Sequence, residues 1–118
     1  MVVKSTIEFP KPKWPPIQDL EGVDIIGKRK DGGVDLAIAV SQPLDGSAET
    51  LDAIRQKIGY YLGVIDLPEF QAKMGHPPRD RTTVVLSCRF PIHPWAAIVI
   101  SECQKAAADR GVRVVVKQ

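Results

Sequence analysis

The sequence predicts an α+β fold, a two-layer sandwich in which a four-stranded mixed sheet carries two helices on one face. Three observations support this: segments that alternate apolar and polar residues as strands do, two longer segments with helical periodicity, and their order, β-β-α-β-α-β. Each strand-helix-strand step requires a right-handed crossover. If both crossovers move in the same direction, both helices cover the same face and the strands lie in chain order. The first pair of strands is then an antiparallel hairpin, and the other pairs are parallel.

Length and composition set the class of protein. A chain of 118 residues is expected to form one domain. Its 44% hydrophobic and 25% charged residues are close to the averages of soluble globular proteins. The net charge of +2 argues against a dedicated nucleic-acid binder, and the lack of a signal-peptide core or a long apolar stretch argues against membrane insertion. Cys88 and Cys103 fall within apolar periodic segments, which indicates reduced thiols and a cytoplasmic protein.

The first part of the chain differs from the rest. Residues 8–17 contain four prolines, which fix φ and lack a backbone donor, so this stretch predicts neither a helix nor an inner strand. We therefore expect a proline-rich extended arm over residues 1–21 and a single α+β domain over residues 22–118. Because the aromatic side chains of Phe9 and Trp14 are costly to leave in water, we expect the arm to lie on its own domain or on a second copy of the chain.

A β-hairpin opens the predicted domain. Residues 23–26 form a short candidate strand, and residues 34–40 alternate between two faces. Between them lies Asp31-Gly32, a dipeptide typical of tight hairpin turns because such turns require positive φ. One face of the second strand is expected to enter the core, and it carries Val34, Leu36, Ile38 and Val40.

An amphipathic helix is predicted over residues 48–65, with Ser47 as its N-cap. Its polar residues are expected on the solvent side: Asp52, Arg55, Gln56 and Lys57. Residues 66–81 are rich in polar residues, glycine and proline, and predict a long loop. We expect Phe70 and Met74 to anchor this loop, and a single helical turn is compatible with it.

The remaining elements are a strand, a helix and a strand. Residues 82–90 alternate as a strand does, and Pro94 suits the first turn of a helix that runs to about Arg110. Gly111 is expected to end this helix in the left-handed conformation, before a last strand over residues 112–116. The inward-facing residues predicted for the third strand are Val84, Leu86, Cys88 and Phe90.

The second face of the sheet is expected to carry no helix. Its side chains would be partly polar and partly small and apolar, so the arm or another subunit could cover them. Because two-fold dimers are the commonest oligomers, we expect a homodimer, with a different protein partner as the alternative. The expected interface consists of Phe9, Trp14, Val85, Arg113 and Val115.

Three features carry a resemblance to a known family: the hairpin, the Leu44-Asp45 turn with the helix that follows it, and the closing helix and strand from Cys103 to Val116. On these features, residues 23–116 resemble an uncharacterised family of bacterial proteins of about this size, a domain of unknown function. The resemblance implies the fold and brings no catalytic residue with it. The proline-rich arm and the long polar loop depart from the family pattern.

No motif identifies a catalytic residue, a metal site or a cofactor. His76 and His93 are the only histidines, and a metal site needs three or four convergent ligands. A metal or nucleophile pair made of Cys88 and His93 is an alternative. However, Cys88 lies in an apolar strand, where an activated thiolate is not expected.

Three carboxylates, on Asp24, Asp35 and Asp45, lie near the ends of predicted strands. Paired carboxylates can perform acid-base chemistry. We interpret these groups as structural, and expect Asp24 and Asp35 to be solvated or paired with Arg89 or Arg113.

The sequence as a whole favours a non-enzymatic binding or assembly module, of a regulatory or toxin-neutralising kind. The first alternative is a small enzyme with a cleft at the carboxyl ends of the strands, where such sheets usually bind ligands. The residues that would form this cleft are Ser41, Gln42, His76, Arg89 and His93. The second alternative is nucleic-acid binding through a basic hairpin tip, which consists of Lys28, Arg29 and Lys30.

Overall fold

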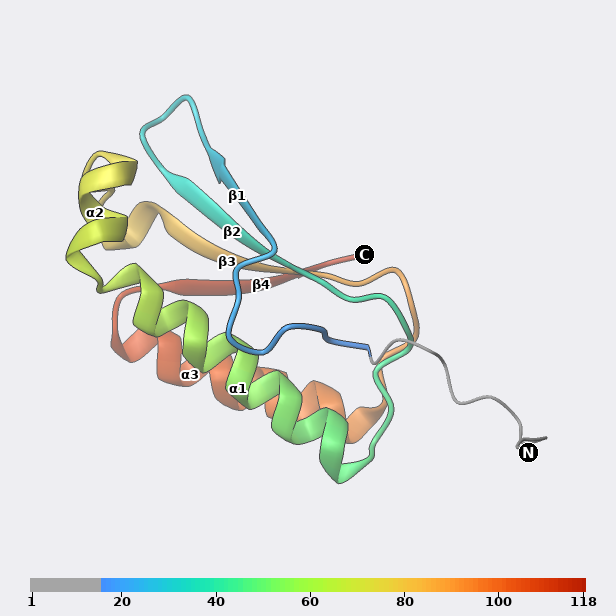
Figure 1. Ribbon diagram of the computed structural model, residues 1–118. Helices are drawn as coiled ribbons and strands as arrows, with labels where there is room; N and C mark the ends of the chain where they lie inside the picture. The colour runs from blue at the N-terminus through green and yellow to red at the C-terminus, as the bar shows by residue number, and fades with distance from the viewer. Residues whose placement is uncertain (1–15) are drawn as a thin grey trace.

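The computed structural model describes residues 16–118, and within them four strands form one mixed sheet (Figure 1). The strands lie in chain order: β1 (Ile25–Lys28), β2 (Val34–Ala39), β3 (Thr82–Ser87) and β4 (Arg113–Lys117). β1 and β2 pair antiparallel, and the other neighbours pair parallel. The predicted fold class and strand order are thus confirmed. Phe9 and Trp14 lie outside the described residues.

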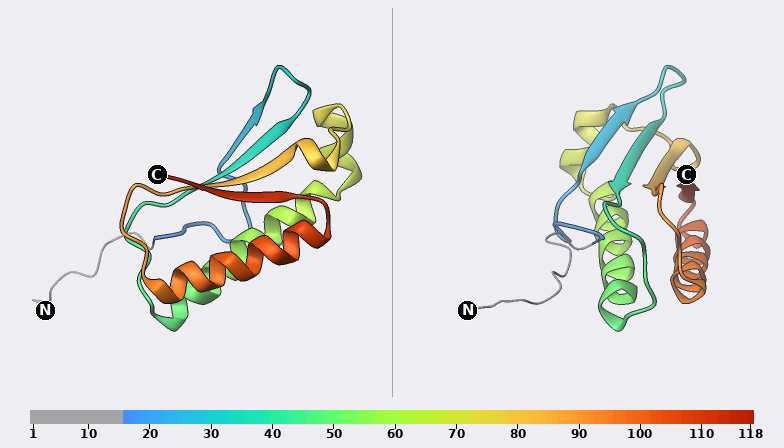
Figure 2. Two further views of the ribbon diagram at one scale, coloured as in Figure 1. Left: turned by 180° about the vertical axis from the view of Figure 1, so that it is seen from behind. Right: turned by 90° about the vertical axis from the view of Figure 1, so that its right-hand side faces the viewer.

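Two long helices, α1 (Ala48–Ile65) and α3 (Pro94–Asp109), cover one face of the sheet and pack against each other (Figure 2). The Ser47 hydroxyl accepts a hydrogen bond from Thr50 N at 3.2 Å, so it caps α1 as predicted. Gly111 has a φ of +79° and follows α3 in the left-handed conformation. Among residues 16–118, no helix has the length and apolar character needed to cross a membrane.

The core lies between the sheet and the two long helices. Leu36 and Val84 are fully buried on the helix side of the sheet, and Ile54 and Tyr61 are fully buried on α1. Ile17 is 3% exposed and belongs to the same core, so the described chain contributes to the core from its second residue. The segment before β1 therefore packs on the domain.

The segment over residues 66–81 was predicted as a long loop, but part of it is helical. It contains the short helix α2 (Pro68–Met74) and a 3₁₀ turn (Arg79–Arg81). Proline is well suited to the first position of a helix, and Gly75, with a φ of +79°, ends α2 in the left-handed conformation. The side chain of Phe70 is 6% exposed and anchors α2 to the core, as expected.

An ion-pair cluster ties this segment to both long helices. Asp66, at the end of α1, accepts hydrogen bonds from Arg79 and Arg110, and Arg110 follows α3. Burial raises the pKa of Asp66, but the bonds from the two guanidinium groups outweigh burial and leave that pKa below its ordinary value.

Two side chains lie where the sequence did not place them. Phe90 was expected to face inward on the third strand, but β3 ends at Ser87 and Phe90 is 36% exposed. Ser87 pairs with Ala39 and with Lys117, which are the last residues of β2 and β4, so the three strands end at the same level. Lys57 was expected on the solvent side of α1, but it is fully buried.

Candidate interaction surface

The face of the sheet opposite the helices carries an apolar row that crosses every strand. The register pairs Ile25 with Ala37, Ala37 with Val85, and Val85 with Val115. Paired residues on neighbouring strands project to the same side of a sheet. The row points away from the helices, because the next residues along the strands, such as Leu36 and Val84, are buried beneath them. We call these four residues the apolar row.

Polar side chains border the apolar row on both sides. On one side, Asp35, Thr83 and Arg113 are aligned across three strands, and on the other side Ser87 is paired with Lys117. The centre of this face is therefore apolar and its borders are polar or charged. That distribution is typical of the centre and rim of a protein interface.

The basic tip of the β-hairpin is partly neutralised. The Arg29 guanidinium bonds to Asp31 at 3.2 Å, to Asp35, and to the carbonyl oxygen of Arg81 at 2.9 Å. A hydrogen bond from Gly33 N, together with Arg29, lowers the pKa of Asp31. Lys28 is exposed beside these pairs. Asp35 was expected to be solvated or paired with Arg89 or Arg113, whereas the structure pairs it with Arg29.

The predicted cleft residues fall into two groups. Ser41, Gln42, Arg89 and His93 follow the carboxyl ends of β2 and β3, where a backbone bond from His93 N to Leu44 O, at 2.8 Å, ties the two connections together. His76 follows α2 and precedes β3, so it lies toward the opposite end of the strands (Figure 1). The structure thus gathers four of the five residues at one end of the sheet.

His93 has a structural role at that end. Its Nδ1 accepts a hydrogen bond from Trp95 N at 3.0 Å and caps α3, and the two rings meet edge to face with centroids 5.4 Å apart. Gly46 packs under the imidazole so closely that a Cβ there would lie 2.8 Å from its ring. Cys88 is fully buried and its thiol donates to Phe90 O at 3.4 Å. Within residues 16–118, no three His, Cys, Asp or Glu side chains come together as a metal site.

Lys57 organises the segment that precedes β1. Its Nζ donates to the carbonyl oxygens of Gln18, Asp19 and Gly22 at 2.8, 2.6 and 2.8 Å, and it pairs with Asp24 Oδ1 at 3.0 Å. Burying a charge is costly unless it is paired and hydrogen-bonded, and this ammonium group is both. Asp24 was expected to be solvated or paired with Arg89 or Arg113, whereas the structure pairs it with Lys57.

Tyr61, one turn after Lys57, joins the same network. Its hydroxyl accepts a hydrogen bond from Asp24 N at 2.8 Å and donates to Ala37 O at 2.7 Å. Burial, with a smaller contribution from the nearby Asp24 carboxylate, raises the pKa of Tyr61 to about 12. Through Asp24 and Ala37, the network fixes the segment before β1 against β2, and so fixes one end of the apolar row.

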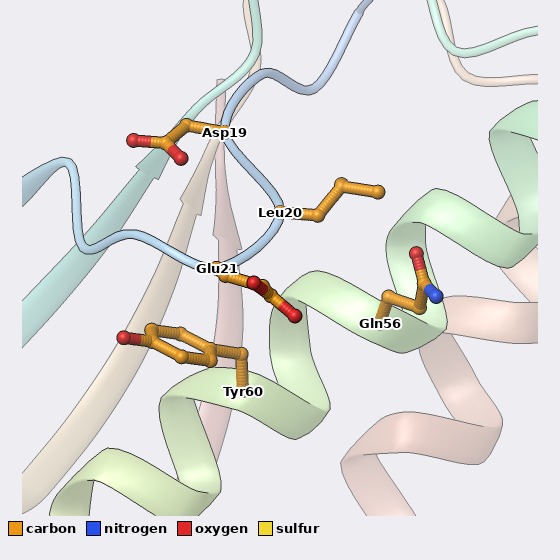
Figure 3. A pocket seen from close by; sticks show the side chains of 5 residues that line it. All are labelled: Asp19, Leu20, Glu21, Gln56 and Tyr60. Atoms are coloured by element: carbon orange, nitrogen blue, oxygen red, sulfur yellow. The ribbon is translucent and has the colours of Figure 1, made fainter.

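A cavity of about 530 Å³ lies beside this network, between α1 and the turn that precedes β1 (Figure 3). Asp19, Leu20 and Glu21 line it from the turn, and Gln56 and Tyr60 line it from α1. Its two carboxylates and its amide would suit a polar or cationic group. No residue of this cavity was predicted as a site, because the two segments are more than thirty positions apart in the sequence.

Comparison with protein-family models, with characterised proteins and with solved structures finds no significant match to this chain. The resemblance to a bacterial family of unknown function therefore stays a prediction.

Proposed function

We propose that this protein is a non-enzymatic binding module that forms a homodimer through the open face of its sheet. The observation that carries the proposal is the apolar row, which runs across the whole width of that face from Ile25 to Val115. Ile25 is 57% exposed, Ala37 and Val115 are partly exposed, and Val85 between them is 9% exposed. An apolar row with a polar border is typical of the centre and rim of a protein interface. A second copy presenting the same face would bury the exposed parts of both rows.

The state of the reactive side chains supports a binding role over a catalytic one. His93 caps a helix, the Cys88 thiol is buried, and the Asp24 and Asp35 carboxylates are held in ion pairs with Lys57 and Arg29. A catalytic group must reach its substrate within hydrogen-bonding distance. We further place the protein in the cytoplasm, where its cysteines remain free thiols.

The test replaces Ile25 with lysine and measures molecular mass by light scattering at micromolar concentration. Ile25 is 57% exposed on an edge strand, so the fold can accept a long polar side chain there. We expect the wild-type chain to be a dimer. In Ile25→Lys, a charge at the most exposed position of the apolar row should raise the dissociation constant by at least about tenfold, which corresponds to about 1.4 kcal/mol.

Ile98→Lys is the matched control. Ile98 is 56% exposed, almost the same as Ile25, but it lies on α3 in the helical layer. This variant should remain a dimer, and far-ultraviolet circular dichroism should show that both variants are folded. A wild-type chain that is monomeric at 100 µM, or equal dissociation constants for the two variants, would reject the homodimer.

A further inference from the structure

Two charged groups on the open face of the sheet have unused hydrogen-bonding capacity. Arg113, on β4, is exposed, and its guanidinium has no acceptor within residues 16–118. The Asp35 carboxylate, on β2, accepts a bond from Arg29 through Oδ1 alone, so within the same residues its Oδ2 has no donor. Arg113 and Asp35 belong to one row across the sheet, with Thr83 between them, but they do not bond to each other.

Gly27 leaves an open space at the β1 end of this row. It pairs with Asp35, so a side chain at this position would project from the open face. A Cβ atom at Gly27 would meet no atom of the described chain within 4 Å. The row thus has a long cationic side chain at its β4 end and no side chain at its β1 end.

The proposed homodimer has two possible aligned arrangements. Sheets that pack face to face in the aligned manner lie about 10 Å apart, with their strands within about 30° of each other. The two-fold axis of such a pair lies between the sheets and runs either along the strands or across them. An axis along the strands sets β4 of one copy over β1 of the other. An axis across the strands sets every strand over its own counterpart.

We propose that the axis runs along the strands, so that Arg113 of each copy crosses Gly27 and bonds to Asp35 of the other copy. This arrangement rests on the homodimer proposed above and specifies how its two faces meet. Arg113 then lies opposite Gly27, whose missing side chain leaves room for it. Asp35 is one strand spacing to the side, about 4.8 Å. An extended arginine side chain, together with the aspartate, spans the gap between the sheets.

Charge favours this arrangement over an axis across the strands. The alternative axis reverses the direction of the second sheet about the apolar row, and so sets Arg113 of each copy over Lys117 of the other. Both side chains are exposed cations on the same face of β4. Like charges juxtaposed across an interface oppose association, and the two-fold axis would create this contact twice. The axis along the strands instead places Arg113 beside a carboxylate.

Asp35 can accept a second guanidinium group while it keeps its bond to Arg29. Both oxygen atoms of a carboxylate accept hydrogen bonds. Asp66 in this molecule shows the same geometry, because its Oδ1 binds Arg79 and its Oδ2 binds Arg110. The free Oδ2 of Asp35 is therefore a suitable acceptor for an arginine of the other copy.

The sizes of the side chains in the apolar row favour the same axis. With the axis along the strands, Ile25 lies over Val115 of the other copy, and Ala37 lies over Val85. The small alanine then faces a larger side chain. With the axis across the strands, two alanines would face each other and leave a gap between the sheets, and gaps cost packing contacts.

Methyl nuclear magnetic resonance on the full-length homodimer distinguishes the two axes. Within one sheet, Ile25 and Val115 are three strand spacings apart, about 14 Å at ~4.8 Å each, which is too far for magnetisation transfer. In a mixture of isotope-labelled and unlabelled chains, we expect transfer between Ile25 of one copy and Val115 of the other. Its absence from an intact dimer, or transfer between the two Ile25 side chains instead, would overturn the proposed arrangement.

Arg113→Glu tests the ion pair. With the axis along the strands, the new carboxylate faces Asp35, and we expect the dissociation constant to rise by at least about tenfold. With the axis across the strands, it would face Lys117 and the dissociation constant would fall, so the sign of the change separates the two arrangements. Lys105→Glu makes the same change of charge at an exposed position of α3 and should alter the dissociation constant by less than about twofold.

The arrangement and the homodimer can fail separately. A monomeric wild-type chain would reject both. A wild-type dimer that Ile25→Lys weakens, but that Arg113→Glu tightens or leaves unchanged, would overturn the arrangement alone. Far-ultraviolet circular dichroism should show that Arg113→Glu is folded, because the side chain it replaces is exposed and has no partner within residues 16–118.

Discussion

At the scale of single residues, Lys57 fixes a charge within the apolar stripe of α1. Position 57 is three residues after Ile54 and four before Tyr61, both buried. This spacing places Lys57 on the inner face of the helix, and it is the signal that sequence analysis could have used. The side chain is tolerated because it ends among oxygen atoms of the segment before β1.

The first prediction concerns the removal of this charge. Lys57→Met keeps much of the aliphatic chain but leaves three carbonyl oxygens and the Asp24 carboxylate without their donor. We expect the free energy of unfolding to fall by about 3 kcal/mol, the lower end of the range for a broken buried pair, because Asp24 keeps some contact with water. Urea denaturation measures the change.

Arg55→Met is the matched control, since Arg55 is exposed on the same helix and should change stability by less than about 0.5 kcal/mol. Adding Asp24→Asn to Lys57→Met should cost less than the sum of the two single changes, because the pair is already broken. Strict additivity would show that the ion pair contributes nothing.

The second prediction concerns the ionisation of Tyr61. Because its folded pKa is raised to about 12, the neutral hydroxyl contributes stability that is complete below the unfolded pKa of 10. This contribution is lost as the pH rises toward 12. Tyr60→Phe leaves Tyr61 as the sole tyrosine, since the chain has two. Its absorbance at the phenolate wavelength should then titrate at about 12, and a midpoint near 10 would contradict the buried network.

Residue-scale prediction succeeded where a side chain's role depends on near neighbours, and failed where it depends on distant ones. Ser47 and Gly111 were placed correctly because a cap is defined by the residues within one helical turn. Lys57 and Asp24 were not paired, because 33 positions separate them and only the folded chain brings them together. Phe90 was misplaced because the apolar alternation continues past Ser87, where the pairing of β3 with its neighbours ends.

At the scale of elements, α1 shows how local signals define a helix. Its observed bounds, Ala48–Ile65, are the bounds that apolar periodicity and the N-cap predict. α2 was predicted only as a loop compatible with one helical turn. It is seven residues long, too short to show a full period, and its glycine and proline neighbours are also typical of loops. In the structure, Pro68 is the first residue of α2 and Gly75 ends it.

The third prediction tests the cap of α1. Ser47→Ala removes the acceptor of Thr50 N and a hydrogen bond to Asp45, so the free energy of unfolding should fall by about 1 kcal/mol. Ser101→Ala makes the same chemical change at an exposed position within α3 and should not destabilise the protein. Equal melting temperatures for the two variants would show that the Ser47 cap is not stabilising.

At the scale of the whole molecule, strand order could be predicted and strand register could not. The order follows from the handedness of two crossovers, a rule that holds for nearly all such connections. The register decides which side chains share a row, and a shift of one residue would move each of them to the other face. Ala37, Val85 and Val115 were expected on the open face from alternation alone, but their alignment in one row, with Ile25 at its end, follows only from the register of the structure.

The last prediction joins the proposed dimer to the stability of the fold. If two copies bury the apolar row against each other, unfolding releases two chains, and mass action makes the midpoint of thermal unfolding depend on protein concentration. A tenfold increase in concentration adds about 1.4 kcal/mol to the folded dimer. For an assembly of two chains of this length, the midpoint should rise by about 3 °C. Differential scanning calorimetry at 10 and 100 µM measures the shift.

Ile25→Lys should abolish this concentration dependence and Ile98→Lys should retain it, because only Ile25 belongs to the apolar row. A wild-type midpoint that is independent of concentration would mean that the open face of the sheet stays in water, and the homodimer would have to be abandoned.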